Sequence, residues 1–304
     1  WGCRCFSGLQ GRRTRAKEGM AMAGNSRNRA VRIGAVAYDP KVVTIWEGFK
    51  PYFAERGAEI DYVLYSTYDA QVEANLAGEV DVAWNSPLAW VKSQIVSHGG
   101  CRAIAMRDSD RDLTTKIVVR TGSPLAALAD LRGKTIAVGA SDSPQATLIP
   151  LELIAEAGVD PEKDCRVLHH NVMVGKHGDH VGGERDAAKA LATGAADAAC
   201  MLDANYVAFV KDGTFAPGAT RVLATTPPFD HCNFTVRADV PEARIKPFLD
   251  ALLAMSFEDA GIRMCMEMEG LRQWLPGRTS GYAQLEKAVQ RFNFYGTAAS
   301  SATV

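Results

Sequence analysis

The feature that most constrains this chain is a repeated unit of a short apolar strand, a polar turn and a helix. The clearest copy spans residues 136–150, in which IAVG is typical of a buried strand and ASDS of a tight turn. Ser143 is a favourable helix N-cap, and Pro144 suits the first helical position because its missing N–H costs nothing there. The unit therefore contains a helix N-terminus, whose free N–H groups and dipole favour an anion.

Three similar units come earlier in the chain. Their predicted strands are residues 31–36, 62–65 and 80–84, and their turns are YDP at 38–40, STYD at 66–69 and NSP at 85–87. Alternating strands and helices favour an α/β fold, and ligands of open parallel sheets bind at the carboxyl ends of the strands. Serine, threonine and aspartate also cap helices that bind nothing. Four such turns at the carboxyl ends of strands nevertheless favour a ligand site over capping alone.

Length and composition allow two lobes and exclude several classes of function. Of the 304 residues, 47% are hydrophobic and 23% are charged, which is typical of a globular protein. The formal net charge of -1 offers no basic field, so we expect no nucleic-acid partner. No apolar run is long enough to predict a transmembrane helix.

The order of the predicted elements indicates two lobes joined by two crossings. Lobe I is discontinuous and comprises residues 30–118 and 229–304, whereas lobe II comprises residues 119–228. Each lobe is expected to be a mixed sheet flanked by helices, with a hinged cleft between the lobes. Residues 1–29 are rich in arginine and lack an apolar core, so they do not fit a secretory signal peptide and are expected to be a disordered leader.

The loop KHGDHVGGE at residues 176–184 is the strongest candidate for metal coordination. Residue types that bind Zn²⁺ gather there: His177, Asp179, His180 and Glu184. The same loop can instead donate hydrogen bonds to an anion at the mouth of a cleft, and we favour this interpretation. These four residues are therefore possible ligand contacts, and we expect no metal and no cofactor.

Other chemical motifs are missing from the sequence. The seven cysteines form no CxxC pair, so we expect most of them to be small buried hydrophobic residues. The sequence contains no nucleophile elbow, no P-loop and no dinucleotide-binding glycine fingerprint. No catalytic residue is predicted.

An ordered set of short segments resembles the substrate-binding component of phosphate, phosphite and phosphonate ABC transporters, which have the type 2 periplasmic-binding fold. The segments are YDP at 38–40, YD at 68–69, LAGEVDVAW at 76–84, IVVR at 117–120, LADLRGKT at 128–135, ATGAADAA at 192–199, WLP at 274–276 and GY at 281–282. No single segment is specific, but their order is. The resemblance covers about residues 31–290 and implies a two-lobed fold with a hinged cleft.

The resemblance also implies which residues hold the ligand. In that family a turn of the Ser-Thr-Ser type opens a second-lobe helix and binds the anion, and here the matching positions are Ser143, Pro144 and Gln145, with Ser141 upstream. Arg185 stands where the family often has a histidine, and Asn85 where it often has an aromatic residue. The predicted ligand-binding residues are Tyr38, Thr67, Tyr68, Asn85 and Ser86 from lobe I and Ser141, Ser143, Gln145, Ala146, Arg185 and Asp203 from lobe II.

Two functions are compatible with these patterns. The first is a solute-binding protein that captures a small oxyanion between its lobes, performs no chemistry and acts with an ABC transporter permease. The second is an enzyme on the same fold, of the type that makes thiamin or menaquinone precursors, with the histidine-rich loop at its active site and a metal as one option. The resemblance favours the first function, a monomer and an extracytoplasmic location. Because no signal peptide is visible, cytoplasmic and organellar locations stay open.

Overall fold

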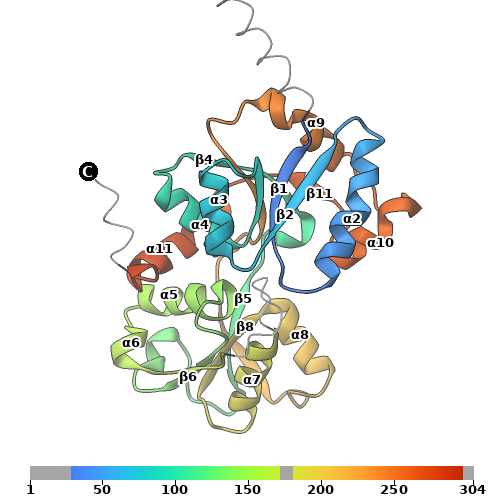
Figure 1. Ribbon diagram of the computed structural model, residues 1–304. Coiled ribbons are helices and arrows are strands. Elements are labelled where there is room, and N and C mark those ends of the chain that lie inside the picture. Colours follow the sequence, from blue (N-terminus) through green and yellow to red (C-terminus); the bar gives the residue numbers. More distant parts are fainter. Residues whose placement is uncertain (1–28, 172–180, 297–304) are drawn as a thin grey trace, which may run out of the picture.

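The computed structural model describes residues 29–171 and 181–296, which form two lobes, each built around one sheet (Figure 1). The predicted leader lies outside the described residues except for Arg29. In the described part of the chain, no helix is both long and apolar enough to span a bilayer.

The first lobe has a six-stranded mixed sheet in the order β11-β4-β10-β3-β1-β2. Its strands are β1 (Val31–Val36), β2 (Ile60–Tyr65), β3 (Val82–Asn85), β4 (Cys101–Arg107), β10 (Asn233–Arg237) and β11 (Trp274–Pro276). The first three strands are parallel, whereas β10 runs antiparallel between β3 and β4. The carboxyl ends of β1, β2 and β3 therefore meet at one edge, as the sequence pattern predicts.

Five helices flank this sheet: α2 (Lys41–Ala54), α3 (Tyr68–Leu76), α4 (Pro87–Val96), α9 (Glu242–Leu253) and α10 (Ala260–Glu269). Aromatic side chains fill the core beneath α2 and α9. The rings of Phe53 and Phe248 stack with centroids 5.2 Å apart, and Phe234 meets Phe248 edge to face at 5.5 Å. Phe234 comes from β10, so the returning chain completes a core that the N-terminal segment begins.

The second lobe has a five-stranded mixed sheet in the order β7-β6-β8-β5-β9. Its strands are β5 (Thr115–Arg120), β6 (Thr135–Val138), β7 (Arg166–His169), β8 (Ala198–Leu202) and β9 (Thr220–Thr225), and its helices are α5 (Ile149–Glu156), α6 (Pro161–Asp164), α7 (Val181–Ala192) and α8 (Asp203–Lys211). Ile117 and Val119 pack on one face of the sheet, and Val118 packs on the other. Both faces are covered because successive strand residues point to opposite sides.

Two helices of the second lobe differ from the sequence prediction. Ser123 and Pro124 ahead of Leu128 and Leu131 predict a short helix, but the chain forms only a 3₁₀ turn at Leu128–Leu131. The Asp130 carboxylate there accepts hydrogen bonds from the backbone N–H groups of Ala126 and Ala127 at 2.7 and 2.9 Å. The helix predicted to begin at Pro144 opens with a wider π turn at Pro144–Leu148.

Proline chemistry explains the π turn. Pro150 has no N–H, so it cannot donate to the carbonyl of Ala146 four residues earlier. That carbonyl instead accepts from the N–H of Gly139 at 3.3 Å, at the end of β6. The first helical turn is thereby attached to the strand that precedes it.

The two crossings between the lobes lie side by side. Leu113 and Phe229 form an isolated antiparallel bridge with reciprocal N–H···O bonds of 2.9 Å. The sequence-based division at 118/119 cuts β5, which belongs entirely to the second sheet. We therefore propose that the first division lies just before Thr115, and that the second stays at 228/229.

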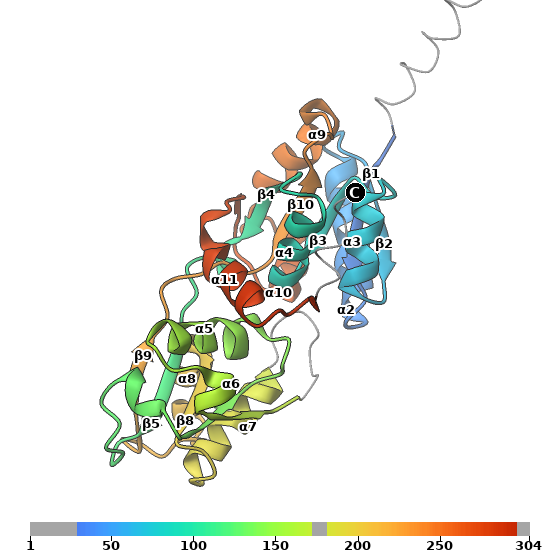
Figure 2. The same ribbon diagram turned by 90° about the vertical axis from the view of Figure 1, so that its left-hand side faces the viewer.

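Helix α11 (Ala283–Arg291) lies between the lobes beside α5, as Figures 1 and 2 show. Its apolar face contributes to a buried cluster shared by the two lobes, with Trp90 from α4 and Leu148 and Ile149 from the second lobe. On the second lobe, Arg291 contacts Glu152 at 2.5 Å. The C-terminal helix thus holds one side of the junction together.

A buried ionic cluster lies beside the crossings. Both carboxylate oxygens of Asp110 accept from the Arg107 guanidinium, at 2.6 and 2.8 Å, and His231 lies 3.4 Å from Asp110. Burial acts to raise the pKa of Asp110, but the charge and hydrogen bonds of Arg107 outweigh burial and hold that pKa well below its usual range. The Asp110 backbone carbonyl also accepts from the N–H of His231 at 2.8 Å, so the cluster joins the two crossings.

We predict that Asp110→Asn lowers the free energy of unfolding by about 3–5 kcal/mol, because it removes the closest counter-charge of the buried Arg107 and leaves only Glu269, at 3.6 Å. Denaturant unfolding at pH 7 measures this loss. Asp250→Asn is the control, since it breaks an exposed pair with Lys246 and should change stability by less than about 1 kcal/mol.

The pH dependence follows from the lowered pKa of Asp110. The stabilisation is present above the unfolded-state value of about 4 and is lost as the pH falls toward the folded-state value. Equal stability of the two variants at pH 7 would contradict this account.

Candidate functional site

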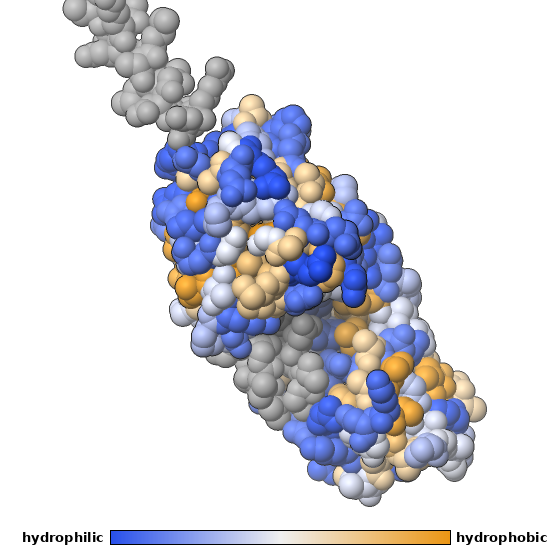
Figure 3. All heavy atoms as spheres, turned by 90° about the vertical axis from the view of Figure 1, so that its right-hand side faces the viewer, coloured by the Kyte–Doolittle hydropathy of each residue, from blue (hydrophilic) through white to orange (hydrophobic). Residues whose placement is uncertain are grey.

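A cavity of about 280 Å³ lies between the lobes at the carboxyl edge of the first sheet. We call it the cleft cavity. Its lining residues are Val36, Ser66, Thr67, Tyr68, Asp69, Ser86, Pro87, Leu88, Ala89, Asp142, Pro144, Phe294 and Tyr295. Figure 3 shows a hollow between the two halves of the molecule on the side that faces away from α11.

Two helix N-termini of the first lobe meet at the cleft cavity. The Thr67 hydroxyl accepts from the N–H of Ala70 at 3.2 Å and caps α3, and the Ser86 hydroxyl accepts from the N–H of Ala89 at 3.2 Å and caps α4. Aligned peptide dipoles place partial positive charge at both ends. The structure therefore brings together three predicted site residues, Thr67, Tyr68 and Ser86.

The turn of the second lobe is arranged differently from the prediction. Ser143 is fully buried, and its hydroxyl accepts from the N–H of Ala146 at 3.2 Å, so these two predicted contacts are bonded to each other. Gln145 is also buried, and its carbonyl accepts from the Thr115 hydroxyl at 2.6 Å. The turn reaches the cleft cavity through Asp142 and Pro144 instead.

Close backbone packing explains why the turn is held so firmly. A Cβ atom on Gly139 would lie 2.7 Å from the Cβ of Ala146, which is closer than real Cβ contacts. The Thr147 hydroxyl donates to the carbonyl of Ala140 at 2.7 Å. These contacts join the end of β6 to the first helical turn and leave Ser143 on the inside.

Two predicted first-lobe contacts have structural roles. Asn85 is fully buried at the end of β3, where its amide nitrogen donates to the hydroxyl of Thr235 at 2.9 Å and its oxygen accepts from Gln71 at 2.8 Å. The half-buried Tyr38 packs against the core of the first lobe. Burial, followed by the negative charge of Glu269, raises the pKa of Tyr38 well above its usual value, so the phenol stays protonated.

The charged residues predicted in the second lobe have partners within that lobe. Arg185 pairs with Asp212 at 2.7 Å, and its guanidinium lies over the ring of Phe209 at 4.6 Å. Asp203 begins α8 and lies 3.5 Å from Lys116. Neither Arg185 nor Asp203 is among the described residues that line the cleft cavity.

Glu184 is not a loop residue, because α7 begins at Val181. Its buried carboxylate accepts from the N–H of Leu202 at 2.8 Å and from the amide of Asn205 at 2.7 Å. It thereby holds α7 against the turn between β8 and α8. The other predicted loop contacts, His177, Asp179 and His180, lie outside the described residues.

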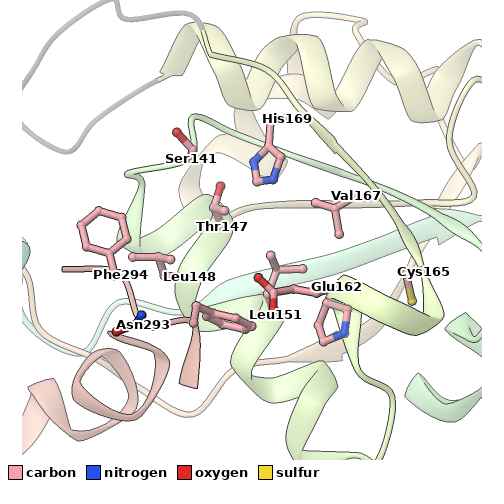
Figure 4. A pocket seen from close by; sticks show the side chains of 12 residues that line it. Ser141, Thr147, Leu148, Leu151, Glu162, Cys165, Val167, His169, Asn293 and Phe294 are labelled. Carbon is pink, nitrogen blue, oxygen red and sulfur yellow. The ribbon is translucent and has the colours of Figure 1, made fainter. Parts of the chain in front are cut away.

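A second cavity, of about 530 Å³, lies in the second lobe beside the same turn. Figure 4 shows Ser141, Thr147 and His169 near one another, Leu148 and Phe294 at one side and Val167 toward Cys165 at the other. Burial lowers the pKa of His169, and the neighbouring His170 lowers it further, so the imidazole is neutral at pH 7. Ser141, predicted to bind the anion with Ser143, belongs to this second cavity rather than to the cleft cavity.

The sequence interpretation missed two aromatic residues of the cleft. Phe294 and Tyr295 follow α11 and line the cleft cavity from the C-terminal side. The signal in the sequence is the run Phe-Asn-Phe-Tyr at 292–295, a largely apolar segment directly after α11. Only the position of α11 between the lobes shows where this segment lies.

One group of described residues has the composition of a metal site. Asp110, His231 and Cys232 offer ligand atoms within 4.8 Å of one another, and all three residues are buried. Both oxygens of Asp110 already accept from Arg107, whose positive charge would repel a cation. This arrangement fits a structural ion pair better than it fits a metal centre.

Comparison with known proteins identifies the family. Residues 35–282 match the family model of the ABC transporter phosphonate periplasmic substrate-binding protein. Because the match covers most of the chain, the chain belongs to this family. The resemblance, the two-lobed fold and the class of solute-binding protein predicted from the sequence are therefore confirmed, whereas the alternative of an enzyme on the same fold gains no support.

Solved structures agree with this fold. PhnD1 of Prochlorococcus marinus in complex with methylphosphonate has a TM-score of 0.60 and 16% identity, with 88% of this chain and 99% of that chain covered. The binding protein of an ABC phosphonate transporter from Pseudomonas aeruginosa has a TM-score of 0.54, 15% identity and coverage of 91% and 90%. The periplasmic aliphatic sulphonate binding protein SsuA of Escherichia coli has a TM-score of 0.53, 18% identity and coverage of 88% and 87%. At these identities the likeness shows the shared fold.

We predict that Glu184→Ala lowers the free energy of unfolding by about 2–3 kcal/mol, because it removes charge-assisted hydrogen bonds and leaves the N–H of Leu202 unpaired. Glu156→Ala is the matched control, since Glu156 forms an exposed pair with Lys287. Its loss should lower the free energy of unfolding by less than about 1 kcal/mol. Thermal and denaturant unfolding measure both. An unchanged free energy of unfolding in Glu184→Ala would mean that this carboxylate does not stabilise the packing of α7 against the turn between β8 and α8.

Proposed function

We propose that this chain binds a small oxyanion of the phosphonate, phosphate or phosphite class in the cleft cavity and delivers it to an ABC transporter permease. The observation that carries the proposal is the meeting of the α3 and α4 N-termini at one cavity between two lobes, in a member of the phosphonate-binding family. Helix N-termini bind anions through free N–H groups and through the helix dipole.

In this proposal the oxyanion lies against the first turns of α3 and α4. The cap residues Thr67 and Ser86 and the hydroxyl of Tyr68 contact it, and the turn at Asp142 closes the opposite side. Burial raises the pKa of Tyr68 well above its usual value, so its hydroxyl remains a hydrogen-bond donor at neutral pH.

The remaining parts of the proposal follow the family. Its members are periplasmic substrate-binding proteins, so we propose an extracytoplasmic monomer that releases its ligand chemically unchanged. Isothermal titration calorimetry with inorganic phosphate, phosphite and methylphosphonate tests binding. Phosphorus NMR of the recovered ligand tests whether it has been altered. Failure of all three ligands to bind would overturn the proposed function.

We predict that Ser86→Ala lowers the affinity for the best of these anions about ten- to a hundredfold, because a hydrogen bond to a charged group contributes roughly 1.5–3 kcal/mol. The lost cap also costs about 0.5–2 kcal/mol of stability. Asp259→Ala separates the two effects, since Asp259 caps α10 by accepting from the N–H of Gly261 at 2.9 Å and does not line the cleft cavity. Unchanged affinity in folded Ser86→Ala would place the anion elsewhere.

A further inference from the structure

The segment Phe292–Tyr295 forms an aromatic wall at the cleft. Phe294 and Tyr295 line the cleft cavity, and their rings meet nearly at right angles, with 5.0 Å between centroids and 87° between planes. Edge-to-face contact is a preferred geometry for aromatic pairs, so each ring restrains the other. Phe294 also lines the second cavity, so this residue borders both cavities.

Contacts with both lobes hold this wall in place. The Tyr295 hydroxyl donates to the carbonyl of Leu88, in the first turn of α4, at 2.7 Å. At the start of the segment, Arg291 pairs with Glu152 of α5. The aromatic wall therefore runs from the second lobe to the very helix turn that we propose binds the oxyanion.

The cleft cavity is larger than an inorganic oxyanion needs. A water molecule takes about 30 Å³ of liquid volume, so 280 Å³ corresponds to roughly nine waters. A tetrahedral oxyanion takes the place of only a few of them. The remaining space is bounded by Phe294, Tyr295 and Leu88, which are suited to an apolar group.

We propose that Phe294 is a specificity-determining residue and that the ligand is an organic oxyanion with an aromatic substituent. Its charged end faces the N-termini of α3 and α4, and its substituent packs on Phe294 and Tyr295. This inference rests on the proposed function and narrows it from small oxyanions in general to those that carry a flat apolar group.

The test compares methylphosphonate with phenylphosphonate, which have the same charged group. By calorimetry, the unaltered chain should bind phenylphosphonate at least about tenfold more tightly, because the phenyl ring buries apolar surface against the wall. Phe294→Ala should lower the affinity for phenylphosphonate about tenfold. It should change the affinity for methylphosphonate by less than about twofold.

The matched control is Phe257→Ala in the first lobe. Phe257 is also half-buried, but its ring packs against Arg263 and Arg272 and lines neither cavity. The affinities for methylphosphonate and phenylphosphonate should therefore both stay unchanged. If Phe294→Ala fails to fold, Phe294→Leu replaces it, since leucine keeps the apolar contact but not the ring. We expect a smaller, still selective loss with Phe294→Leu.

The outcomes separate this inference from the proposed function. If the unaltered chain binds both phosphonates equally, the proposed role of Phe294 in specificity is wrong. The same holds if Phe294→Ala weakens the binding of both equally. In either case the proposed oxyanion site is not contradicted. No binding of inorganic phosphate, phosphite or either phosphonate would overturn the proposed function and this inference together.

Discussion

The packing of α11 across the junction of the lobes is the interaction on which the site depends. Within residues 29–171 and 181–296, two chain crossings connect the lobes covalently, and their bridge at Leu113 and Phe229 is short. The buried cluster of α11 with Trp90 of α4 and Leu148 of the second lobe adds apolar burial from both lobes. Both α4 and the turn at 141–148 contribute residues to the cleft cavity, so the packing of α11 holds together two elements that line it.

The electrostatics of the cleft come from backbone more than from charged side chains. Asp212 pairs with Arg185, and Asp110 pairs with Arg107. At the cleft itself, the carboxylate of Asp69 lies 2.6 Å from Lys92, so their charges largely cancel, whereas Asp142 brings a further carboxylate from the second lobe. Under the proposed function, recognition of an anion therefore relies on helix N-termini and hydroxyl groups. Such groups are directional, so they select the geometry of an oxyanion as well as its charge.

Much of the fold could be predicted from local patterns because those patterns have local causes. The strand at Val31–Val36 and the caps at Thr67 and Ser86 follow from apolar periodicity and from cap chemistry within a few residues. The second-lobe helix was predicted less well. Pro150 and the carbonyl of Ala146 alter its first turn through a bond to the preceding strand, and that bond is not visible in a helical pattern.

The sequence by itself determined the α/β class, the resemblance to phosphonate-binding proteins and the turns that carry hydroxyl groups. Only the tertiary structure decided which of these hydroxyl groups line the cleft cavity. The resemblance assigns Ser143 to the ligand, but its side chain is buried, because its hydroxyl accepts a hydrogen bond from the N–H of Ala146 in a closely packed turn. Phe294 has no binding motif but reaches the cleft cavity, because α11 packs between lobes that are distant in the sequence. The physical reason is that capping is a local interaction, whereas exposure at a cleft depends on how separate segments pack.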